Sequence, residues 1–406
     1  MTDHSFTRYQ KIIILILAIT QFTVILDFMI MAPLGDLMMK KLNLKPAEFA
    51  LAVSAYAFSA GASGLLAAGF ADRFDRKKLL LFFYCGFILG TVFCGLAQSY
   101  TALLGARIFT GLFGGVIGSI SMAIITDVFM LQQRGRVMGF VQMGLGASQV
   151  LGIPISIFIA SKFGWYAPFW MVAGIGIIAL IGIVYVMNPI IAHLNLKRTY
   201  TVTSHLWHTV SQKSYRICYT ATAMIAVTGF MLAPFSSSFA INNLGLTYDN
   251  LTIIMMASGI SSLFIMPIIG KFSDRIDKLK IFSIAILVTM VTCVIYTNLS
   301  AASFSIILLL NILLSGGMLS RMIPASALTS AVPLNEDRGA FMSINASIQQ
   351  MAGGVGAVLS GMLVTQKSPS SPLVHYGSLG VIVAIFSAIA WLMIYRVNKI
   401  VVKGQD

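Results

Sequence analysis

Three ionisable side chains interrupt long apolar runs of this sequence, and they are the residues best placed to do chemistry. Asp27 lies in the first run, between Leu26 and Phe28, and Arg107 and Arg321 lie in two later runs. A charged side chain inside a bilayer is costly unless it is paired or faces water, and it marks a functional site by default. Since burial favours the uncharged form of a carboxyl group, Asp27 is a candidate for gaining and losing a proton near neutral pH. The alternative is a structural carboxylate that stays paired with a neighbouring arginine.

Asp27 and Arg321 have no charged equivalents in the other half of the chain. Aligning the prolines that follow in the first span of each half places Thr228 opposite Asp27, and aligning the paired glycines of two later spans places Ser119 opposite Arg321. Arg321 could bind an anionic group of a substrate, stabilise the ionised form of an acid or pair with Asp27 itself, and a purely structural pairing is the competing explanation. For Arg107 we expect a structural or gating role, with a part in proton movement as the alternative.

The composition places these residues in lipid. Of the 406 residues, 58% are hydrophobic and 10% are charged, whereas soluble domains carry about 25% charged residues. A net charge of +14 would suggest nucleic acid as the partner of a soluble protein. Here the basic residues stand at the ends of apolar runs, where they orient a membrane protein and contact anionic lipid head groups, so no nucleic acid is expected.

Twelve apolar runs are long enough to cross a bilayer as helices, six in each half of the chain. Only helices or closed barrels satisfy the backbone in lipid, and runs of this length exclude barrel strands, so we expect an all-α integral membrane protein. The expected spans are 11–35, 49–70, 79–98, 101–128, 137–161, 166–188, 216–240, 251–271, 280–299, 303–332, 340–365 and 375–397.

The distribution of basic residues predicts that both termini are cytoplasmic. With the N-terminus inside, only five lysines fall outside, and every other lysine or arginine apart from Arg107 and Arg321 falls inside, as the positive-inside rule requires. The expected organisation is a six-helix bundle over 1–188, a cytoplasmic linker over 189–215 and a second six-helix bundle over 216–406. The lysines placed outside are Lys40, Lys41, Lys45, Lys162 and Lys367.

A short motif repeats half a chain apart and links the two sets of spans. The pattern Phe-x-Asp-Arg-x-Asp follows the second and the eighth span, with its first aspartate at Asp72 and at Asp274. Such a repeat indicates two similar halves around a shared site. The first copy, from Ala68 to Lys77, resembles the cytoplasmic signature of the major facilitator superfamily, Gly-x-Leu-Ala-Asp-Arg-x-Gly-Arg-Lys, with Ala68 and Asp75 in place of its two glycines. The resemblance covers the whole chain and implies the major facilitator fold of two pseudo-symmetric six-helix bundles.

The resemblance also implies a gate between the halves on the cytoplasmic side. In the family, the residue matching Asp72 caps the eleventh span, and the residue matching Arg76 pairs with an acid at the end of the fourth span, here Asp127. A carboxylate at a helix N-terminus is stabilised by about 0.3–1 kcal/mol, so the role is physically reasonable. The alternative is that these charges only anchor and orient the spans. The gating residues implied are Asp72, Arg73, Arg76, Asp127, Asp274 and Arg275.

The fifth span is similar to the glycine-rich helix of the drug–proton antiporter branch of that family. It carries Gly146, Gly152 and Pro154, but Ile153 separates Gly152 from the proline and Ser156 replaces a usual glycine. Small residues let helices approach closely and a proline bends the helix. The proline has no equivalent in the second half, which favours export, while plain helix packing is the competing explanation.

Several polar and aromatic side chains within the spans are candidates for lining a central substrate cavity, although some could serve only to join helices. With Asp27 and Arg321, the expected cavity residues are Gln21, Tyr56, Gln142, Gln149, Phe235, Asn345 and Gln349.

The leading hypothesis is a proton-coupled antiporter that exports a small amphipathic drug or metabolite, including metabolites of the siderophore type, by alternating access. The alternative is a proton symporter or facilitator that imports a sugar, an organic acid or another nutrient. The sequence shows no nucleophile–base pair, metal cluster or nucleotide-binding loop, so we expect neither an enzyme nor a cofactor, and the proton gradient is the expected energy source. We expect a monomer in the inner (plasma) membrane whose partners are lipid, protons and a small-molecule substrate.

Overall fold

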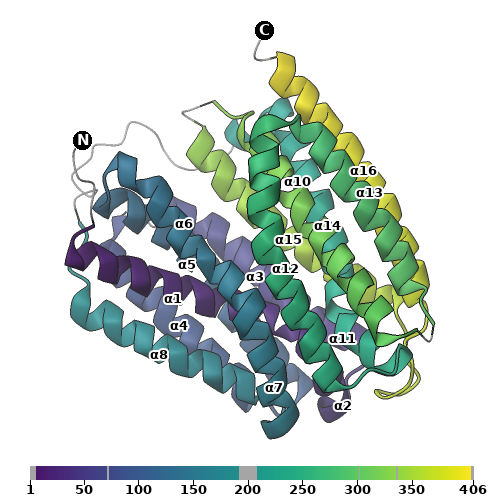
Figure 1. Ribbon diagram of the computed structural model, residues 1–406. Coiled ribbons are helices and arrows are strands. Elements are labelled where there is room, and N and C mark those ends of the chain that lie inside the picture. Colours follow the sequence, from purple (N-terminus) through teal and green to yellow (C-terminus); the bar gives the residue numbers. More distant parts are fainter. Residues whose placement is uncertain (1–5, 71–72, 192–207, 301, 335–336, 404–406) are drawn as a thin grey trace.

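The computed structural model describes residues 6–70, 73–191, 208–300, 302–334 and 337–403. These residues fold into long helices that run back and forth in one slab, as expected for an all-α membrane protein (Figure 1). The first half comprises α1 (Arg8–Met29), α2 (Met31–Leu42), α3 (Pro46–Phe70), α4 (Arg76–Leu96), α5 (Tyr100–Val128), α6 (Leu131–Ala147), a π-helical turn (Ser148–Gly152), α7 (Ile153–Phe163) and α8 (Ala167–Val186).

The second half repeats this order of crossings. It comprises α10 (Lys213–Leu232), a 3₁₀ turn (Ala233–Phe235), α11 (Ser236–Ser238), a second π-helical turn (Phe239–Asn243), α12 (Tyr248–Arg275), α13 (Lys278–Thr297), α14 (Phe304–Ser330), α15 (Arg338–Leu363) and α16 (Tyr376–Lys403).

The described helices account for the twelve expected crossings. Eleven helical segments are long and apolar enough to span a bilayer. The twelfth crossing is α15, which has 26 residues and is the more polar helix that carries Asn345 and Gln349. The chain is therefore a multi-pass membrane protein. The first crossing is longer than the sequence predicted, because α2 continues it to Leu42 after Ile30, the single residue between the two helices.

Because successive crossings alternate in direction, the helix ends gather on two sides. We call the side that holds the start of α1 and the end of α16 the terminal side, and the opposite side, where α2 and α11 lie, the far side (Figure 1). The described parts of the repeated Asp-Arg loops and of the linker expected over 189–215 lie on the terminal side. Most of that linker, 192–207, falls outside the described residues.

On the terminal side, the second aspartate of each motif begins a helix. Asp75 caps α4 by accepting a hydrogen bond from the backbone N–H of Lys77, and Asp277 caps α13 by accepting from Leu279 and Lys280. An aspartate at this position satisfies N–H groups that a helix start leaves unpaired. This explains why Asp75 can stand where the family signature has a glycine.

Glycines let helices within each half approach closely. In the first half, a Cβ added at Gly115 of α5 would lie 2.3 Å from the backbone oxygen of Ala60 on α3. In the second half, a Cβ added at Gly317 of α14 would lie 2.6 Å from Oγ1 of Thr289 on α13. Small residues at crossing points are the usual way in which membrane helices gain contact area.

The two halves meet along two pairs of helices. In the first pair, Gly61 of α3 faces Ser347 and Met351 of α15. In the second pair, α12 packs against α7 and the π-helical turn before it, where a Cβ added at Gly259 would lie 2.6 Å from the backbone oxygen of Gln149. These close approaches fix how the halves are placed in this conformation.

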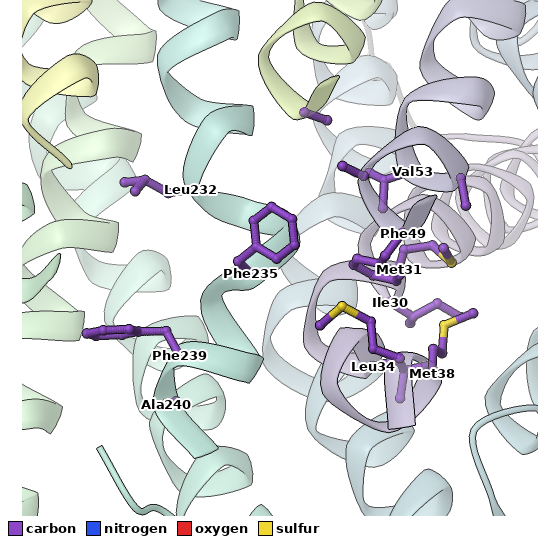
Figure 2. Close-up of a cluster of buried hydrophobic side chains, with 14 of the residues drawn as sticks. Ile30, Met31, Leu34, Met38, Phe49, Val53, Leu232, Phe235, Phe239 and Ala240 are labelled. Carbon is purple, nitrogen blue, oxygen red and sulfur yellow. The ribbon is translucent and has the colours of Figure 1, made fainter. Parts of the chain in front are cut away.

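The buried apolar clusters show that the halves are joined on the far side. One cluster contains residues of both halves, and Phe235 points from the second half toward Phe49 and Met31 of the first, with ring centroids of Phe49 and Phe235 6.5 Å apart (Figure 2). On the terminal side each half has its own cluster. Within the described ranges, the partly buried Leu65 of α3 is the one first-half side chain that packs against the cluster of the second half. The conformation is therefore closed on the far side.

The glycine contacts predict a difference between two substitutions in α5. Gly115→Ala forces α3 and α5 apart, because the added methyl group meets backbone atoms of Ala60, whereas no atom lies within 4 Å of a Cβ at Gly105. We expect Gly115→Ala to lower the stability by about 1–3 kcal/mol, the usual effect of overpacking. Gly105→Ala should leave the Tm unchanged or raise it, since alanine favours a helix. Thermal unfolding of the purified protein in detergent measures both, and equal Tm values for the two variants would contradict this packing.

Candidate functional site

Asp27 and Arg107 form an ion pair inside the first half. Nη1 of Arg107 on α5 donates to Oδ2 of Asp27 on α1 at 2.8 Å, and both side chains are fully buried. Oγ1 of Thr91 on α4 donates to the other carboxylate oxygen at 3.1 Å. The pair joins three helices through charge-assisted hydrogen bonds, which are stronger than those between neutral groups.

Tyr56 of α3 covers the arginine of this pair. The guanidinium carbon of Arg107 lies 4.5 Å from the centroid of the Tyr56 ring, a cation–π geometry. A Cβ added at Gly114 would lie 2.6 Å from the Tyr56 hydroxyl, so the glycine makes room for the ring. Nε and Nη2 of Arg107 have no hydrogen-bond partner among the described residues. Asp27 and the ring are therefore the main groups that compensate the buried charge.

An aromatic row leads from this pair into the second half. The ring centroid of Phe28 lies 5.2 Å from that of Tyr56 and 5.4 Å from that of Phe230 on α10. Phe28 directly follows Asp27 in the sequence, so the buried acid is one residue away from the contact between the halves. A change in the ion pair can thus reach the interface through packed rings.

Arg321 does not pair with Asp27, whose partner is Arg107. Arg321 lies on α14, is 1% exposed, and makes one long hydrogen bond of 3.4 Å from Nη2 to the backbone oxygen of Ile225 on α10. Its Nε and Nη1 have no partner among the described residues. The two arginines that the sequence placed in the membrane therefore differ, since one is compensated by an acid and the other is not.

The other expected cavity residues are spread over several environments. Phe235 and Tyr56 are fully buried in packed regions, and Gln142 is exposed. Half-buried positions are held by Gln21, Gln149, Asn345 and Gln349. In this conformation Phe235 belongs to the far-side core rather than to an open space, and a cavity role for these residues stays a prediction.

The terminal-side residues include the ion pair that the family resemblance implied. Nε of Arg76 donates to Oδ2 of Asp127 at 3.1 Å, joining the start of α4 to the end of α5. Both residues belong to the first half, so this bond does not by itself hold the halves together. Arg73 and Arg275 are exposed. Asp72 and the side chain of Asp274 lie outside the described part of the structure, and the gating roles stay predictions.

The expected antiporter-like helix is interrupted where it meets the second half. The π-helical turn Ser148–Gly152 separates α6 from α7, and Pro154 follows in the first turn of α7. A Cβ added at Gly146 would lie 3.6 Å from Leu263 of α12, and one added at Gly152 would lie 2.6 Å from Leu26 of α1. Gly152 thus lets this helix contact the residue that precedes Asp27. Single π-helical turns of this kind are frequent at functional sites.

A polar junction on the far side was not expected from the sequence. The fully buried carboxylate of Asp36 on α2 accepts hydrogen bonds from Nδ2 of Asn242 and the hydroxyl of Tyr248 in the second half, and from Nζ of Lys40. Its backbone N–H donates to Oγ of Ser237 on α11, whose hydroxyl donates to the backbone of α2.

Two sequence signals could have indicated this junction. Asp36 and Lys40 have the spacing of an ion pair on one helix face. The proline alignment of the halves places Ser237 opposite Asp36. Both signals were missed because the first span was expected to end at residue 35, before Asp36.

In the described ranges, no group of three or more His, Cys, Asp or Glu side chains is placed so that it could hold a metal ion.

Comparison with known proteins identifies relatives of the whole chain and of parts of it. Over 363 residues, 87% of this chain and 89% of the relative, it is 22% identical to multidrug resistance protein 2 of Bacillus subtilis (strain 168). It is 32% identical over 164 residues to the MFS-type transporter YceJ of the same organism, an alignment that spans only 42% of that relative. It is also 30% identical over 147 residues, 36% of this chain and 38% of the relative, to multidrug resistance protein MdtL of Escherichia coli (strain SMS-3-5 / SECEC).

Solved structures share the fold at low sequence identity. A bacterial homologue of the human lysosomal transporter Spinster, crystallised in an inward-facing and unoccupied conformation, superposes with a TM-score of 0.78 at 16% identity and covers 98% of this chain and 99% of its own. A D-xylose–proton symporter gives a TM-score of 0.77 at 16% identity over 93% and 97% of the two chains. The family model of the Major Facilitator Superfamily matches residues 17–207 and 218–405. With this match across both halves, the chain belongs to the Major Facilitator Superfamily and is a membrane transporter rather than an enzyme.

Proposed function

We propose that the protein is a proton-coupled antiporter that exports small amphipathic compounds, with Asp27 as the proton-coupling residue. The observation that carries the proposal is the fully buried ion pair of Asp27 and Arg107. A paired carboxylate and guanidinium are together neutral, so the pair is tolerated in an apolar bundle. Protonation of Asp27 removes one charge and leaves the other uncompensated, a change that costs about 3–5 kcal/mol in a buried site. A proton on Asp27 therefore disfavours this conformation.

The preference of each conformation for one charge state of Asp27 sets the order of events in an exchange cycle. The far-closed conformation favours ionised Asp27 paired with Arg107, and a far-open conformation would favour protonated Asp27. A proton taken up from the far side would then be released after the change to the far-closed state, and substrate would bind to that state and leave in the opposite direction. Coupling of this kind requires only that each ligand has a different affinity for the two states.

The direction of transport is proposed on two grounds. Two of the relatives are named multidrug resistance proteins. The interrupted helix with Gly146, Gly152 and Pro154 contacts both α1, which carries Asp27, and α12 of the second half. That contact would link the state of the acid to the interface that must open. An importer driven by protons would use the same fold, and the direction of movement distinguishes the two.

The proposed orientation follows the charge distribution. The repeated basic loops lie on the terminal side, which we place in the cytoplasm of a cell with the chain in its inner (plasma) membrane. In this orientation the structure would be the inward-facing state of a monomer. The far-side junction of Asp36 would be its outer gate, and the terminal-side residues from Asp72 to Asp127 would form its inner gate.

The coupling role predicts that Asp27→Asn abolishes accumulation driven by a pH gradient. The measurement is uptake of a panel of amphipathic dyes and metabolites into proteoliposomes, with and without an imposed gradient. We expect a loss of at least about tenfold in gradient-driven uptake, equivalent to about 1.4 kcal/mol, with exchange in the absence of a gradient retained. Movement of substrate against the proton flow supports export, and movement with the flow supports the importer.

Because Asp27→Asn leaves Arg107 unpaired, a second variant separates coupling from folding. Asp27→Asn/Arg107→Gln removes both charges and should recover stability without recovering coupling. Asp249→Asn, which alters an exposed acid of α12, is the matched control and should transport normally. Full gradient-driven uptake by either Asp27 variant would rule out the coupling role.

The outer-gate role predicts that Asp36→Asn shifts the population toward far-open conformations. Hydrogen bonds to a charged group are worth about 1.5–3 kcal/mol, and this carboxylate receives two from the second half. Lys41 and Lys367 are exposed far-side positions in different halves. Spin labels attached to Lys41→Cys and Lys367→Cys report the distance between the halves by double electron–electron resonance spectroscopy. We expect a larger fraction of long spin–spin distances for Asp36→Asn than for the unaltered Asp36 background, and no such increase for Asp249→Asn. Identical distance distributions with and without Asp36→Asn would contradict a gating role of Asp36.

A further inference from the structure

Arg321 is a buried cation that forms no ion pair with any described residue. It is 1% exposed, and its Nε and Nη1 have no hydrogen-bond partner among the described residues. The bond from Nη2 to the Ile225 backbone, at 3.4 Å, is long for an N–H···O contact. Arginine stays protonated in proteins, so it cannot lose its charge as a buried lysine does. The charge must therefore be compensated from elsewhere.

The sequence of the second half contains no acid that could reach it. Its acidic residues are at helix ends or in the tail: Asp249, Asp274, Asp277, Glu336, Asp337 and Asp406. Arg321 is nine residues before the end of α14, a distance of about 14 Å along the helix at 1.5 Å per residue. The acid of the first span, Asp27, is already bound to Arg107. Among the ionisable residues that interrupt the apolar runs, Asp27, Arg107 and Arg321, the positive charge of Arg321 is therefore left uncompensated.

This surplus charge lies close to the contact between the halves. A Cβ added at Gly229 of α10 would lie 3.8 Å from Nη2 of Arg321, so no side chain separates the guanidinium from the backbone there. The next residue, Phe230, packs against Phe28 of the first half, with the two rings tilted by 52°. Arg107 contacts Tyr56 at one end of the aromatic row, and Arg321 lies beside Gly229, next to Phe230 at the other end. That row is part of the interface that a rocking movement would separate.

We propose that Arg321 is the anion-recognition point of the transported substrate, and that the substrate class is amphipathic organic anions. An oxyanion of the substrate, such as a carboxylate or sulfonate, accepts hydrogen bonds from Nε and Nη1 and supplies the missing negative charge. The apolar part of the substrate packs on the aromatic row beside Phe230. The inference rests on the proposed transport function and names the chemical class that the function would act on.

Charge balance explains why such a residue would be kept in an apolar helix. A buried charge left unpaired destabilises a folded protein, and a partner that binds only the folded state offsets that loss. If Arg321 had a purely structural role, its removal would instead lower the stability of the ligand-free protein. The two roles are therefore separable by the stability of the ligand-free protein.

The test uses matched probes that differ only in charge. Purified full-length protein in detergent is titrated with 2-naphthoate, 2-naphthamide and 2-naphthylmethylammonium, with the octyl series octanoate, octanamide and octylammonium, and with inorganic phosphate alone. Affinity is measured by calorimetry and the Tm by thermal unfolding. We expect at least one organic anion to bind tenfold more tightly than its neutral counterpart and to raise the Tm, while phosphate alone does neither.

Variants of Arg321 assign that preference to this residue. Arg321→Gln and Arg321→Met should abolish the preference for anions and leave the ligand-free Tm unchanged or higher. Arg321→Lys should retain part of the preference. Asp249→Asn, the exposed control on α12, should retain it fully. Because binding is measured at equilibrium without a pH gradient, a failure of proton coupling and a failure of anion recognition give different results. The proposal is overturned if no organic anion is preferred, if phosphate alone binds equally well, or if the preference persists in Arg321→Gln.

Discussion

The ion pair between Asp27 and Arg107 is the interaction on which the rest of this structure depends. It places two opposite charges, 2.8 Å apart and fully buried, within a bundle that is otherwise apolar. Leaving either charge unpaired in such a place costs about 3–5 kcal/mol, so the two side chains are strongly favoured to remain together or to change their surroundings together. Thr91 and Tyr56 bring two further helices into contact with the pair, and Phe28 brings in the second half. In the proposed mechanism, the protonation of this one carboxylate would therefore act on the packing of the interface between the halves.

The internal repeat provides the frame in which this pair can act. Features that occur in both halves hold helices together or begin them, as the caps Asp75 and Asp277 do. Features that occur once break the symmetry: Asp27 has Thr228 opposite it, and Arg321 has Ser119. On the far side, Asp36 and its counterpart Ser237 form a direct contact between the halves. A symmetric scaffold with asymmetric charges can adopt two similar states that differ in charge environment, which a carrier requires.

The helical crossings and the family could be predicted from the sequence because each rests on a local pattern. Long apolar runs specify helices whatever their neighbours, and the repeated Asp-Arg motif marks the same loop in both halves. The partner of Asp27 could not be predicted, because pairing depends on how α1 and α5 pack, and two arginines were available. Asp36 was missed because its partners Asn242 and Tyr248 come from the other half of the chain. A charge within a run is visible in a sequence, whereas its compensation is a property of the packed helices.

In the proposed mechanism, Asp27 exchanges Arg107 for a proton when the far side opens. The most direct measurement is the infrared carboxyl band of Asp27, taken as the difference between the wild-type background and Asp27→Asn. The band would be recorded during acidification in two samples. In one the far side is free to open, and in the other it is held shut by a short thiol cross-linker between Lys41→Cys and Lys367→Cys. The account predicts a protonated-carboxyl band in the free protein that is absent or appears only at lower pH in the cross-linked protein. The same titration of that band in both samples would contradict it.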